Sequence, residues 1–419
     1  MKKKMIKPLS SLDGEVVLPG SKSYTVRALV IGALASGETV LKNPLFSEDT
    51  ECMIQGLRSL GARIERREGT LLAVGTGGKL HPTEETLDLK GAGTAVRFLT
   101  TVAGLCGKQI VVDGNRRMRE RPIQDLLEGL KPLGIRARTM FGNGCPPILI
   151  EGGEFRGGRT QLRGDKSSQF LSSILLCGPY AREEVAVEIT GDLVSRSYAD
   201  MTLEIMREFG AQVSRQDDRF FRVTPGRYQG REYVVEGDLS SASYFFAAAA
   251  ITGGRIVVKG VHRFTKQGDQ GLLEILERMG CEVHRGGHWA EIIGGRLQGV
   301  DVDMNSMPDA VPALAVVAAF AEGETRIIGV EHLQYKETNR LAALGKELGK
   351  MGIETLLEKG AFVVKGGAPV GTEIDTYQDH RMAMAFAIAG LKVPGMVIQN
   401  PDCVNKSFPS FWTLLGGLG

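Results

Sequence analysis

The chain has 419 residues, of which 42% are hydrophobic and 24% charged, and its formal net charge is +2. This length predicts two or three domains, and the near-neutral charge argues against bulk attraction to nucleic acid or to a membrane surface. No apolar run is long enough to span a bilayer, and residues 1–14 lack the apolar core of a signal peptide. The six cysteines show no paired metal-binding spacing, so we expect reduced thiols in a cytoplasmic protein.

The first recognisable segment is a strand that ends at Leu18, followed by a Pro-Gly turn and an apolar helix. Ser21 or Ser23 is suited to cap this helix, because a hydroxyl can accept from the unpaired amides of the first turn. Lys22 and Arg27 lie beside the helix start, where free amides and the dipole favour an anion. The segment therefore predicts a phosphate or carboxylate site, and the alternative is a pair of solvated cations flanking a cap.

Similar segments recur at intervals of roughly 70 residues and open five more apolar helices, which indicates six repeats of several elements each. They begin near residues 91, 164, 237, 307 and 378. Each leading helix is followed by a second helical run that ends in a hydrophobic residue and a glycine, which is typical of a left-handed C-cap. These glycines are Gly61, Gly134, Gly210, Gly280, Gly352 and Gly419.

Each repeat reads as strand, helix, strand, helix, strand, with short β-rich pieces such as residues 70–74 that predict hairpins. If three repeats in each half pack about a pseudo-threefold axis, their leading helices can point their N-termini toward one face. Such a face would concentrate positive potential on an anionic ligand. The cations at the leading turns are Lys22, Arg27, Arg97, Lys166 and Arg381.

A basic run at residues 116–122 precedes the second helix of the second repeat. Arg121, just before Pro122, is placed to bind an oxyanion with two N–H groups. The alternative for this run is a solvated basic loop. A nucleic-acid surface is not favoured, because no aromatic residues interleave with the arginines.

Carboxylates and cations gather in the fifth and sixth repeats. Lys336 and Arg340 are four residues apart, which predicts one helix face, and Glu337 lies between them. An exposed helix with ion pairs is the alternative interpretation. Asp309 and Glu337 among so many cations suit proton transfer beside an anionic substrate. His380, at a helix start, is the one histidine that the pattern places for chemistry.

Common cofactor motifs are absent from the sequence. Residues 20–23 mimic the end of a P-loop but lack its preceding glycine, and residues 91–93 lack the third glycine of a dinucleotide-binding fingerprint. No His-x-x-x-His or Cys-x-x-Cys metal pair occurs. The sequence therefore gives no motif that indicates a metal or an organic cofactor.

These motifs and their order resemble the 5-enolpyruvylshikimate-3-phosphate synthase family of enolpyruvyl transferases, over essentially the whole chain. The matching stretches are LPGSKS at 18–23, GAGTAVR at 91–97, RMRERPI at 117–123, SSQF at 167–170, EGDLSSASYF at 236–245, DMNSMPDA at 303–310, KETNR at 336–340, DHRMAM at 379–384 and NKSFP at 405–409.

The resemblance implies an α/β fold, a two-domain inverse α/β barrel with three repeats per domain. The first domain would span residues 19–236 and the second residues 1–18 plus 237–419, and the two would close around two anionic substrates. The implied reaction transfers the enolpyruvyl group of phosphoenolpyruvate to the 5-hydroxyl of shikimate 3-phosphate and releases phosphate, in the shikimate pathway to chorismate and aromatic amino acids. The resemblance implies no cofactor, no nucleic-acid or membrane partner, and a monomer.

The resemblance also implies roles for particular residues. Shikimate 3-phosphate would be bound by Lys22, Ser23, Arg27, Ser167, Ser168, Gln169, Ser195, Asp309 and Lys336. Phosphoenolpyruvate would be bound by Lys22, Gly93, Thr94, Arg121, Gln169, Arg340, Arg381 and Lys406. Asp309 would be the base at the acceptor hydroxyl, and Glu337 the proton donor and acceptor at the donor methylene, with Lys22 and His380 as helpers.

This sequence departs from the family pattern at a few positions, which we expect to alter substrate affinity rather than chemistry. They are Val26, Gly91, Ser197, His332 and Asn339.

The nearest alternative function is that of the UDP-N-acetylglucosamine enolpyruvyl transferases, which share the fold and the donor. That family carries a reactive cysteine in a flexible loop, whereas here the corresponding repeat holds RMRERP, and Cys145 lies later. An anion-binding repeat protein without activity is the alternative of another class, and the carboxylates at Asp309 and Glu337 argue against it.

Overall fold

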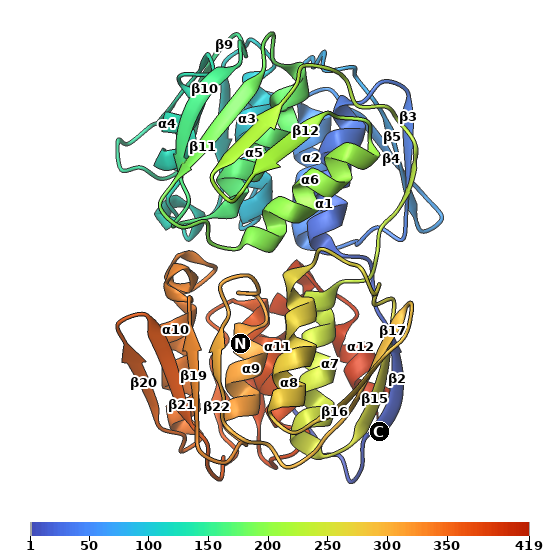
Figure 1. The fold of residues 1–419 in the computed structure, drawn as a ribbon, viewed down its shortest axis with the longest axis vertical. Helices are drawn as coiled ribbons and strands as arrows, with labels where there is room; N and C mark the ends of the chain where they lie inside the picture. Colours follow the sequence, from blue (N-terminus) through green and yellow to red (C-terminus); the bar gives the residue numbers. More distant parts are fainter. Residues whose placement is uncertain (1, 419) are drawn as a thin grey trace. The chain divides into compact units, whose positions relative to one another are not determined.

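The computed structural model describes residues 2–418, and the chain divides into two compact units (Figure 1). The inserted unit is Gly20–Val235. The terminal unit joins the N-terminal segment through Pro19 to the segment that starts at Glu236. Each unit has its own hydrophobic core.

The inserted unit contains three sheets within the described residues, ordered β14-β3-β5-β4, β6-β7-β9-β8 and β10-β11-β13-β12. Its helices, with η marking short 3-10 helices, are α1 (Lys22–Leu34), α2 (Glu48–Ser59), α3 (Gly93–Gly104), η1 (Met118–Glu120), α4 (Gln124–Leu130), α5 (Ser168–Cys177), η2 (Gly178–Tyr180) and α6 (Arg196–Glu208). Its strands are β3 (Glu38–Lys42), β4 (Arg63–Arg67), β5 (Thr70–Val74), β6 (Thr86–Asp88), β7 (Ile110–Asp113), β8 (Ile135–Thr139), β9 (Ile148–Gly153), β10 (Gly158–Arg163), β11 (Val185–Thr190), β12 (Val213–Gln216), β13 (Phe220–Val223) and β14 (Glu232–Val234).

The terminal unit contains, over the part of the chain described, the sheets β2-β15-β17-β16, β18-β19-β21-β20 and β1-β23-β22. Its helices are α7 (Leu239–Thr252), η3 (Gly268–Gly271), α8 (Leu272–Arg278), α9 (Val311–Ala318), η4 (Glu331–Tyr335), α10 (Arg340–Lys350), α11 (His380–Ala389), η5 (Pro401–Lys406) and α12 (Phe411–Gly416). Its strands are β1 (Lys3–Met5), β2 (Asp13–Val17), β15 (Arg255–Lys259), β16 (Glu282–Arg285), β17 (Trp289–Ile293), β18 (Asp301–Asp303), β19 (Glu324–Ile328), β20 (Thr355–Glu358), β21 (Ala361–Lys365), β22 (Glu373–Ile374) and β23 (Val397–Gln399).

Five of the six sheets in the described residues share one topology, which the second repeat shows well, whereas the sheet β1-β23-β22 has three strands and no hairpin. Strand β6 leads into helix α3 and then into β7, which pairs parallel with β6 because the helix provides the crossover. Helix α4 follows, and the hairpin β8–β9 completes the sheet on the other side of β7. The predicted α/β fold of repeated strand–helix units is confirmed, and the predicted strand at residues 70–74 is β5.

The first repeat of each unit takes its leading strand from a distant part of the chain. In the inserted unit, β14 from the end of the segment pairs parallel with β3 near its start. In the terminal unit, β2 from the N-terminus pairs parallel with β15. Strand β1 also joins this unit and pairs antiparallel with β23. Each unit is thus complete in its strand pairing.

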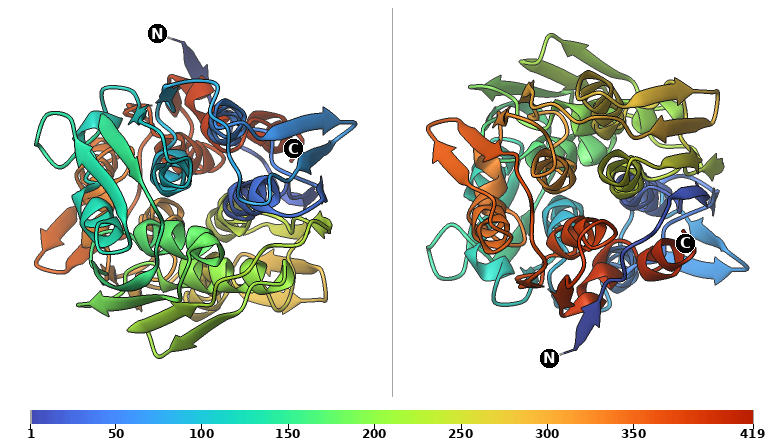
Figure 2. Two further views of the ribbon diagram at one scale, coloured as in Figure 1. Left: turned by 90° about the horizontal axis from the view of Figure 1, so that it is seen from above. Right: turned by 90° about the horizontal axis from the view of Figure 1, so that it is seen from below.

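The leading helices form the centre of each unit and the sheets surround them (Figure 2). Helices α1, α3 and α5 contact one another, as do α7, α9 and α11. Their sequences are apolar on all sides, so burial on all sides is the stable arrangement. In contrast, α2, α6 and α10 carry one buried and one polar face and cover the centre. This is the inverse of an ordinary α/β barrel, with helices inside and strands outside.

The predicted helix ends are confirmed where the structure describes them. Ser21, not Ser23, caps α1, and its hydroxyl accepts from the amide of Tyr24 at 3.5 Å. The five predicted C-cap glycines from Gly61 to Gly352 all have positive φ, between 79° and 108°, and Gly419 lies outside the described residues. Between residues 2 and 418, no helix combines the length and the apolar character that crossing a membrane requires.

Candidate active site

The start of α1 places Lys22 against a carboxylate of the neighbouring helix. The Lys22 Nζ lies 3.1 Å from the Asp49 Oδ2, and both side chains are largely buried. Asp49 belongs to the acidic first turn of α2, which the helix dipole favours. Asp49 was not predicted from the sequence, because its 27-residue separation from Lys22 gives no local signal.

Arg27 is buried and held by a set of internal hydrogen bonds. Its Nε donates to the Thr202 Oγ1 at 2.8 Å, and its Nη1 donates to the Ser23 carbonyl at 2.9 Å. Its Nη2 donates to the Tyr198 carbonyl at 3.0 Å and to the Ser172 Oγ at 3.4 Å. Burial lowers the pKa of Arg27 to about 10, so the guanidinium remains charged near neutral pH. These bonds fix a cation where α1, α5 and α6 meet.

The start of α3 brings two guanidinium groups to one glycine. A Cβ at Gly93 would lie 2.5 Å from the Arg121 Nη1 and 2.6 Å from the Arg97 Nη1. The Arg97 Nη1 also donates to the Gly93 carbonyl at 2.9 Å. Only glycine lets both arginines approach this helix N-terminus so closely. Two cations at the start of a 12-residue helix form a suitable site for an anion.

Helix α5 adds an amide side chain to α3. The Gln169 Nε2 donates to the Thr94 Oγ1 at 3.1 Å. Ser167 caps α5 by accepting from the amide of Gln169 at 3.3 Å, and Ser168 is buried in its first turn. The Gln169 Oε1 is buried and accepts no hydrogen bond from residues 2–418. A buried acceptor without a donor is costly, so this oxygen is suited to a ligand that donates.

Two further polar positions flank these helices in the inserted unit. Ser195, at the N-cap position of α6, has a left-handed φ of 56°, which is rare for a residue other than glycine. Lys166 precedes α5, and its Nζ lies 2.9 Å from the Asp125 Oδ2. Sequence analysis singled out Lys166 as a cation at a leading turn but did not assign it to the site.

The terminal unit contains a buried cation surrounded by carboxylates. Arg340 is 1% exposed, and its Nε lies 2.7 Å from the Asp379 Oδ2. Its Nη2 lies 2.8 Å from the Glu337 Oε2, and its Nη1 lies 3.1 Å from the Asp309 Oδ1. Burial alone would lower the pKa of Arg340, but the three carboxylates, Asp379 first, together raise it. This guanidinium is permanently charged and bridges the two predicted proton-transfer groups.

Arg381 binds the other oxygen of the same aspartate. Its Nη2 lies 2.6 Å from the Asp309 Oδ2, and its Nη1 donates to the Tyr244 hydroxyl at 3.2 Å. Its amide donates to the Asp379 Oδ1 at 2.9 Å, which caps α11. Burial raises the pKa of Tyr244 to about 12, and the nearby Arg381 offsets part of that rise. Asp309 is thus held between Arg340 and Arg381.

The predicted shared helix face of Lys336 and Arg340 is wrong. Lys336 follows η4 in an extended conformation, and α10 begins at Arg340. The cause is Asn339, whose side chain accepts from the amide of Ala342 at 3.2 Å and so starts the helix later. The alternative of an exposed ion-paired helix is also wrong here, because Arg340 and its carboxylates are buried or nearly so.

The remaining predicted residues of the terminal unit are largely buried. His380 is the first residue of α11, and its Nδ1 lies 3.5 Å from the Asp379 Oδ1. Burial, and then the charge of Lys336, lower the pKa of His332 to about 3, so this imidazole is neutral at pH 7. Lys406 ends η5 and is also buried.

The structure therefore brings the predicted residues into local groups. Gly93 and Arg121 meet at α3, where Thr94 meets Gln169, and Asp309 and Glu337 meet at Arg340. Four residues of these groups were not assigned to the site from the sequence: Asp49, Arg97, Asp379 and Tyr244. Arg97, Asp379 and Tyr244 lie inside the motifs that carry the family resemblance, and those motifs are the signal that could have identified them. Across residues 2–418, no set of three or more His, Cys, Asp or Glu side chains is arranged to bind a metal.

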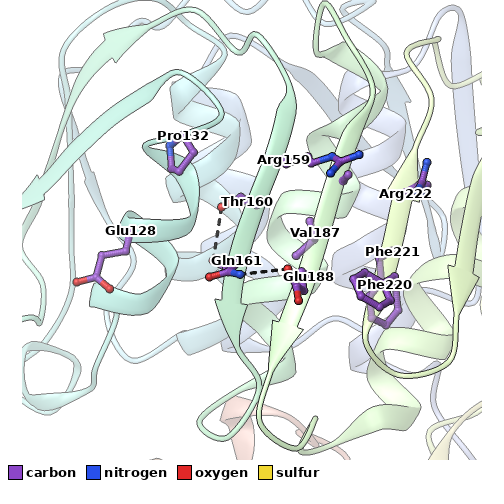
Figure 3. A pocket seen from close by; sticks show the side chains of 11 residues that line it. Glu128, Pro132, Arg159, Thr160, Gln161, Val187, Glu188, Phe220, Phe221 and Arg222 are labelled. Carbon is purple, nitrogen blue, oxygen red and sulfur yellow. Dashed lines mark hydrogen bonds between the residues drawn. The ribbon is translucent and has the colours of Figure 1, made fainter.

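A separate pocket lies on the outer side of the third sheet of the inserted unit (Figure 3). Its walls include Arg159, Gln161, Glu188 and Phe220, and the Gln161 Nε2 donates to the Glu188 Oε2 at 3.1 Å. None of the predicted site residues is among the residues that line it. The pocket therefore does not contribute to the candidate site.

Comparison with known proteins points to one family. The model of the family EPSP synthase (3-phosphoshikimate 1-carboxyvinyltransferase) matches residues 6–415. A 3-phosphoshikimate 1-carboxyvinyltransferase from Nostoc sp. is 42% identical over 406 residues, which cover 96% of each chain. One from Methanoculleus marisnigri is 44% identical over 411 residues, or 97% of each chain.

Solved structures give the same result. An EPSP synthase from Acinetobacter baumannii aligns with a TM-score of 0.83 at 29% sequence identity. The alignment covers 100% of this chain and 98% of that one.

Proposed function

We propose a function from the premise that this chain belongs to the EPSP synthase (3-phosphoshikimate 1-carboxyvinyltransferase) family. It transfers the enolpyruvyl group of phosphoenolpyruvate to the 5-hydroxyl of shikimate 3-phosphate and releases phosphate. This is a transferase reaction of the shikimate pathway, which leads to chorismate and the aromatic amino acids. The UDP-N-acetylglucosamine transfer considered above is not favoured.

The donor, phosphoenolpyruvate, carries a carboxylate and a phosphate and so requires several cations. In the inserted unit we assign it to Gly93, Thr94, Arg121 and Gln169, together with Lys22. The close approach of Arg121 to Gly93, and the buried Gln169 side chain, support this assignment. In the terminal unit we assign it to Arg340, Arg381 and Lys406.

The acceptor, shikimate 3-phosphate, carries a phosphate, a carboxylate and hydroxyl groups. We assign it to residues at three helix starts of the inserted unit and to two residues of the terminal unit. They are Lys22, Ser23, Arg27, Ser167, Ser168, Gln169, Ser195, Asp309 and Lys336. The N-termini of α1 and α5 support this assignment, since the amides of a first helical turn and the helix dipole favour an anion such as phosphate.

The proposed chemistry uses two carboxylates for two proton transfers. Asp309 accepts the proton of the acceptor hydroxyl as its oxygen attacks the central carbon of the enol, and Glu337 donates a proton to the methylene carbon. In the second step, the methyl carbon returns a proton to Glu337 while the C–O bond to phosphate breaks. Lys22 and His380 are assigned as helpers. Because Arg340 contacts both carboxylates, it can hold them in a fixed relation through both steps.

The observation that carries this proposal is the Asp309–Arg340–Glu337 arrangement, with Arg381 on the second oxygen of Asp309. The test is phosphate release from phosphoenolpyruvate with shikimate 3-phosphate or UDP-N-acetylglucosamine as acceptor. We expect turnover with the first acceptor and none with the second. Turnover with only the second would overturn the assignment.

We also propose that the inserted and terminal units correspond to the two enolpyruvyl-transferase domains, at residues 19–236 and at 1–18 plus 237–419. Since both substrates draw ligands from both domains, turnover should require both, and saturating ligands should lower the radius of gyration in small-angle scattering. A monomer in the cytoplasm is the proposed state. Sedimentation at several protein concentrations tests the oligomeric part.

A further inference from the structure

A carboxyl group outside the assigned site lies buried behind Asp309 and Arg381. Asp269 belongs to η3, is 5% exposed, and its Oδ2 accepts from the Ser240 hydroxyl at 2.7 Å. Its Oδ1 is also buried and has no hydrogen-bond partner among the described residues. An ionised oxygen in this setting is costly, because neither water nor a donor solvates its charge.

Helix α7 connects Asp269 to the assigned site. Ser240 and Tyr244 are four residues apart and share a face of the helix, so one turn separates the two contacts. Ser240 binds Asp269, and Tyr244 accepts from Arg381, which in turn binds Asp309.

The segment that carries Asp269 is fixed to the start of α7. The Gln267 Nε2 donates to the Gly237 carbonyl at 2.7 Å, and its Oε1 accepts from the Leu239 amide at 3.1 Å. A Cβ on Gly271 would overlap the Met307 Cε, so η3 also packs against the residues before Asp309. A change of charge at Asp269 therefore acts on a rigid neighbourhood.

The charged groups that face Asp269 come from three elements. Asp238 lies at the start of α7, Asp309 precedes α9, and Arg381 lies in α11. Two carboxylates against one cation disfavour a third negative charge. Burial, and then the charge of Asp309, raise the pKa of Asp269 to about 7, while the hydrogen bond from Ser240 lowers it.

We propose that Asp269 is a positioning residue that carries a proton in the substrate-free enzyme and, once ionised, weakens the attraction of Arg381 for the anionic donor. Ionisation releases the proton to solvent and leaves the rest of the cluster unchanged. This inference rests on the proposed role of Arg381 in binding phosphoenolpyruvate. It adds to the assigned ligands a residue that touches neither substrate.

The kinetic test compares the KM for phosphoenolpyruvate of the wild type and of Asp269→Asn at about pH 6 and about pH 8. Because titration of the substrate is the same for both enzymes, it cancels in the ratio. We expect the ratio of wild-type to variant KM to rise by roughly three- to tenfold between the two pH values. A constant ratio would indicate a purely structural role and would overturn the proposal.

Ser240→Ala serves as a second variant that retains the carboxyl group. It removes the hydrogen bond that stabilises the ionised form, so the rise in KM should move to higher pH. A rise at unchanged or lower pH contradicts the proposal. Circular dichroism at each pH checks that both variants are folded.

Thermal unfolding without substrates tests the proton itself. The raised pKa means that the folded state binds the proton more tightly than the unfolded chain does. Wild-type stability relative to Asp269→Asn should therefore fall as pH rises from about 4 to about 7 and then level off. If the stability of the wild type and that of Asp269→Asn changed equally with pH, the proposal would be overturned. An Arg381→Lys variant with unchanged KM would refute the assigned donor site and leave this unfolding result unaffected.

Discussion

Arg340 makes ion pairs with three carboxylates that differ in their exposure to solvent. Asp379 is fully buried, whereas the side chains of Asp309 and Glu337 are 17% and 16% exposed. A buried cation needs a permanent partner, because an unpaired charge in the interior costs several kcal/mol. Asp379 supplies that partner, and it also caps α11. In the proposed mechanism, Glu337 and Asp309 can therefore exchange protons while Asp379 still balances the charge of the guanidinium.

The first prediction concerns Glu337→Gln. The amide keeps the size of the side chain and can still accept from Arg340, but it cannot carry a proton between donor and solvent. Positioned acid–base catalysis contributes about 10²–10⁴-fold, so kcat should fall by that factor while KM changes little. In deuterated water the variant should also incorporate less deuterium into the donor methylene.

A matched control is Glu331→Gln, which makes the same chemical change at an exposed position in η4. This variant should keep normal turnover and exchange. Normal methylene exchange in folded Glu337→Gln would assign the proton transfer to another residue, with Lys22 the first to examine.

The second prediction uses the neutral, buried imidazole of His332. Its pKa is about 3 in the folded state and ordinary in the unfolded chain, so the unfolded chain binds a proton first as the solution is acidified. The free energy of unfolding is therefore unaffected by this histidine above about pH 6.5, and it decreases as the pH falls below that value.

Replacement by an uncharged polar residue, His332→Asn, removes this titration. The melting temperature of the wild type relative to the variant should fall as pH decreases from about 6.5 toward about 4. If the melting temperatures of the wild type and the variant changed by the same amount with pH, His332 would not be buried in its neutral form.

The third prediction concerns Cys145, which lies in a loop of the second repeat. Burial raises the pKa of its thiol, and the nearby cations Arg97 and Lys166 only partly offset this rise. A mostly protonated thiol is a poor nucleophile. Cys145→Ala should therefore keep near-normal turnover with shikimate 3-phosphate, and a loss of several hundredfold in a folded variant would contradict the assignment.

At the scale of the element, the leading helices were predictable because they are apolar on every side. Four of them, α1, α5, α7 and α11, also begin at a side-chain cap. Helix α1 buries every residue from Tyr24 to Leu34, and its N-cap Ser21 was one of two candidates. The boundary before α10 was not predictable from spacing alone. The four-residue spacing of Lys336 and Arg340 predicts a helix that includes both residues. The Asn339 side chain instead caps the helix, so α10 begins at Arg340.

The contacts between elements were less accessible to sequence reasoning. Tyr244 and Arg381 are 137 residues apart in sequence, and nothing in either motif shows that a tyrosine hydroxyl would accept from that arginine. Lys22 and Asp49 are a similar case. The motifs predicted which helix starts would carry chemistry, but the packing of the central helices determines which side chains meet.

The fourth prediction belongs to the start of α3. In Gly93→Ala the new methyl would meet the ends of Arg121 and Arg97, which are flexible and can move aside. The fold should therefore survive, while the guanidinium groups lose their positions against the helix N-terminus. We expect the KM for phosphoenolpyruvate to rise by about tenfold or more, with little change in melting temperature.

The control is Gly349→Ala in α10, where a Cβ would meet no atom within 4 Å. Alanine favours a helix over glycine by about 1 kcal/mol, so this variant should melt slightly higher and keep its KM. If Gly93→Ala bound the donor normally, the two arginines would not be the anion site of this helix.

At the scale of the whole molecule, the chain path explains why composition gave no domain boundary. The inserted unit interrupts the terminal unit between β2 and α7, and no Pro- or Ser-rich linker marks either crossing. The six-repeat pattern indicated crossings near residues 19 and 236, and the assignment of the N-terminal strand to the second domain came from the family resemblance. The reason is topological, since β2 and β14 each complete a first repeat whose other elements lie elsewhere in the sequence.

The last prediction follows from this path. In the inserted unit, every strand finds its partners within Gly20–Val235, and the buried core of that segment forms one cluster. A fragment of residues 20–235 should therefore fold alone and unfold cooperatively in a thermal melt followed by circular dichroism. It contains Ser23 and Arg27 but lacks Asp309, so calorimetry should detect weakened binding of shikimate 3-phosphate, and turnover should be absent.

The matched control is a fragment of residues 20–230, which lacks β14. Strand β3 then loses its parallel partner and becomes an exposed edge, which removes the hydrogen bonds that close the first repeat. This shorter fragment should melt at a lower temperature or aggregate. If residues 20–235 gave no cooperative transition, or if both fragments melted alike, the inserted unit would depend on the rest of the chain for its fold, and β14 would not be the element that completes it.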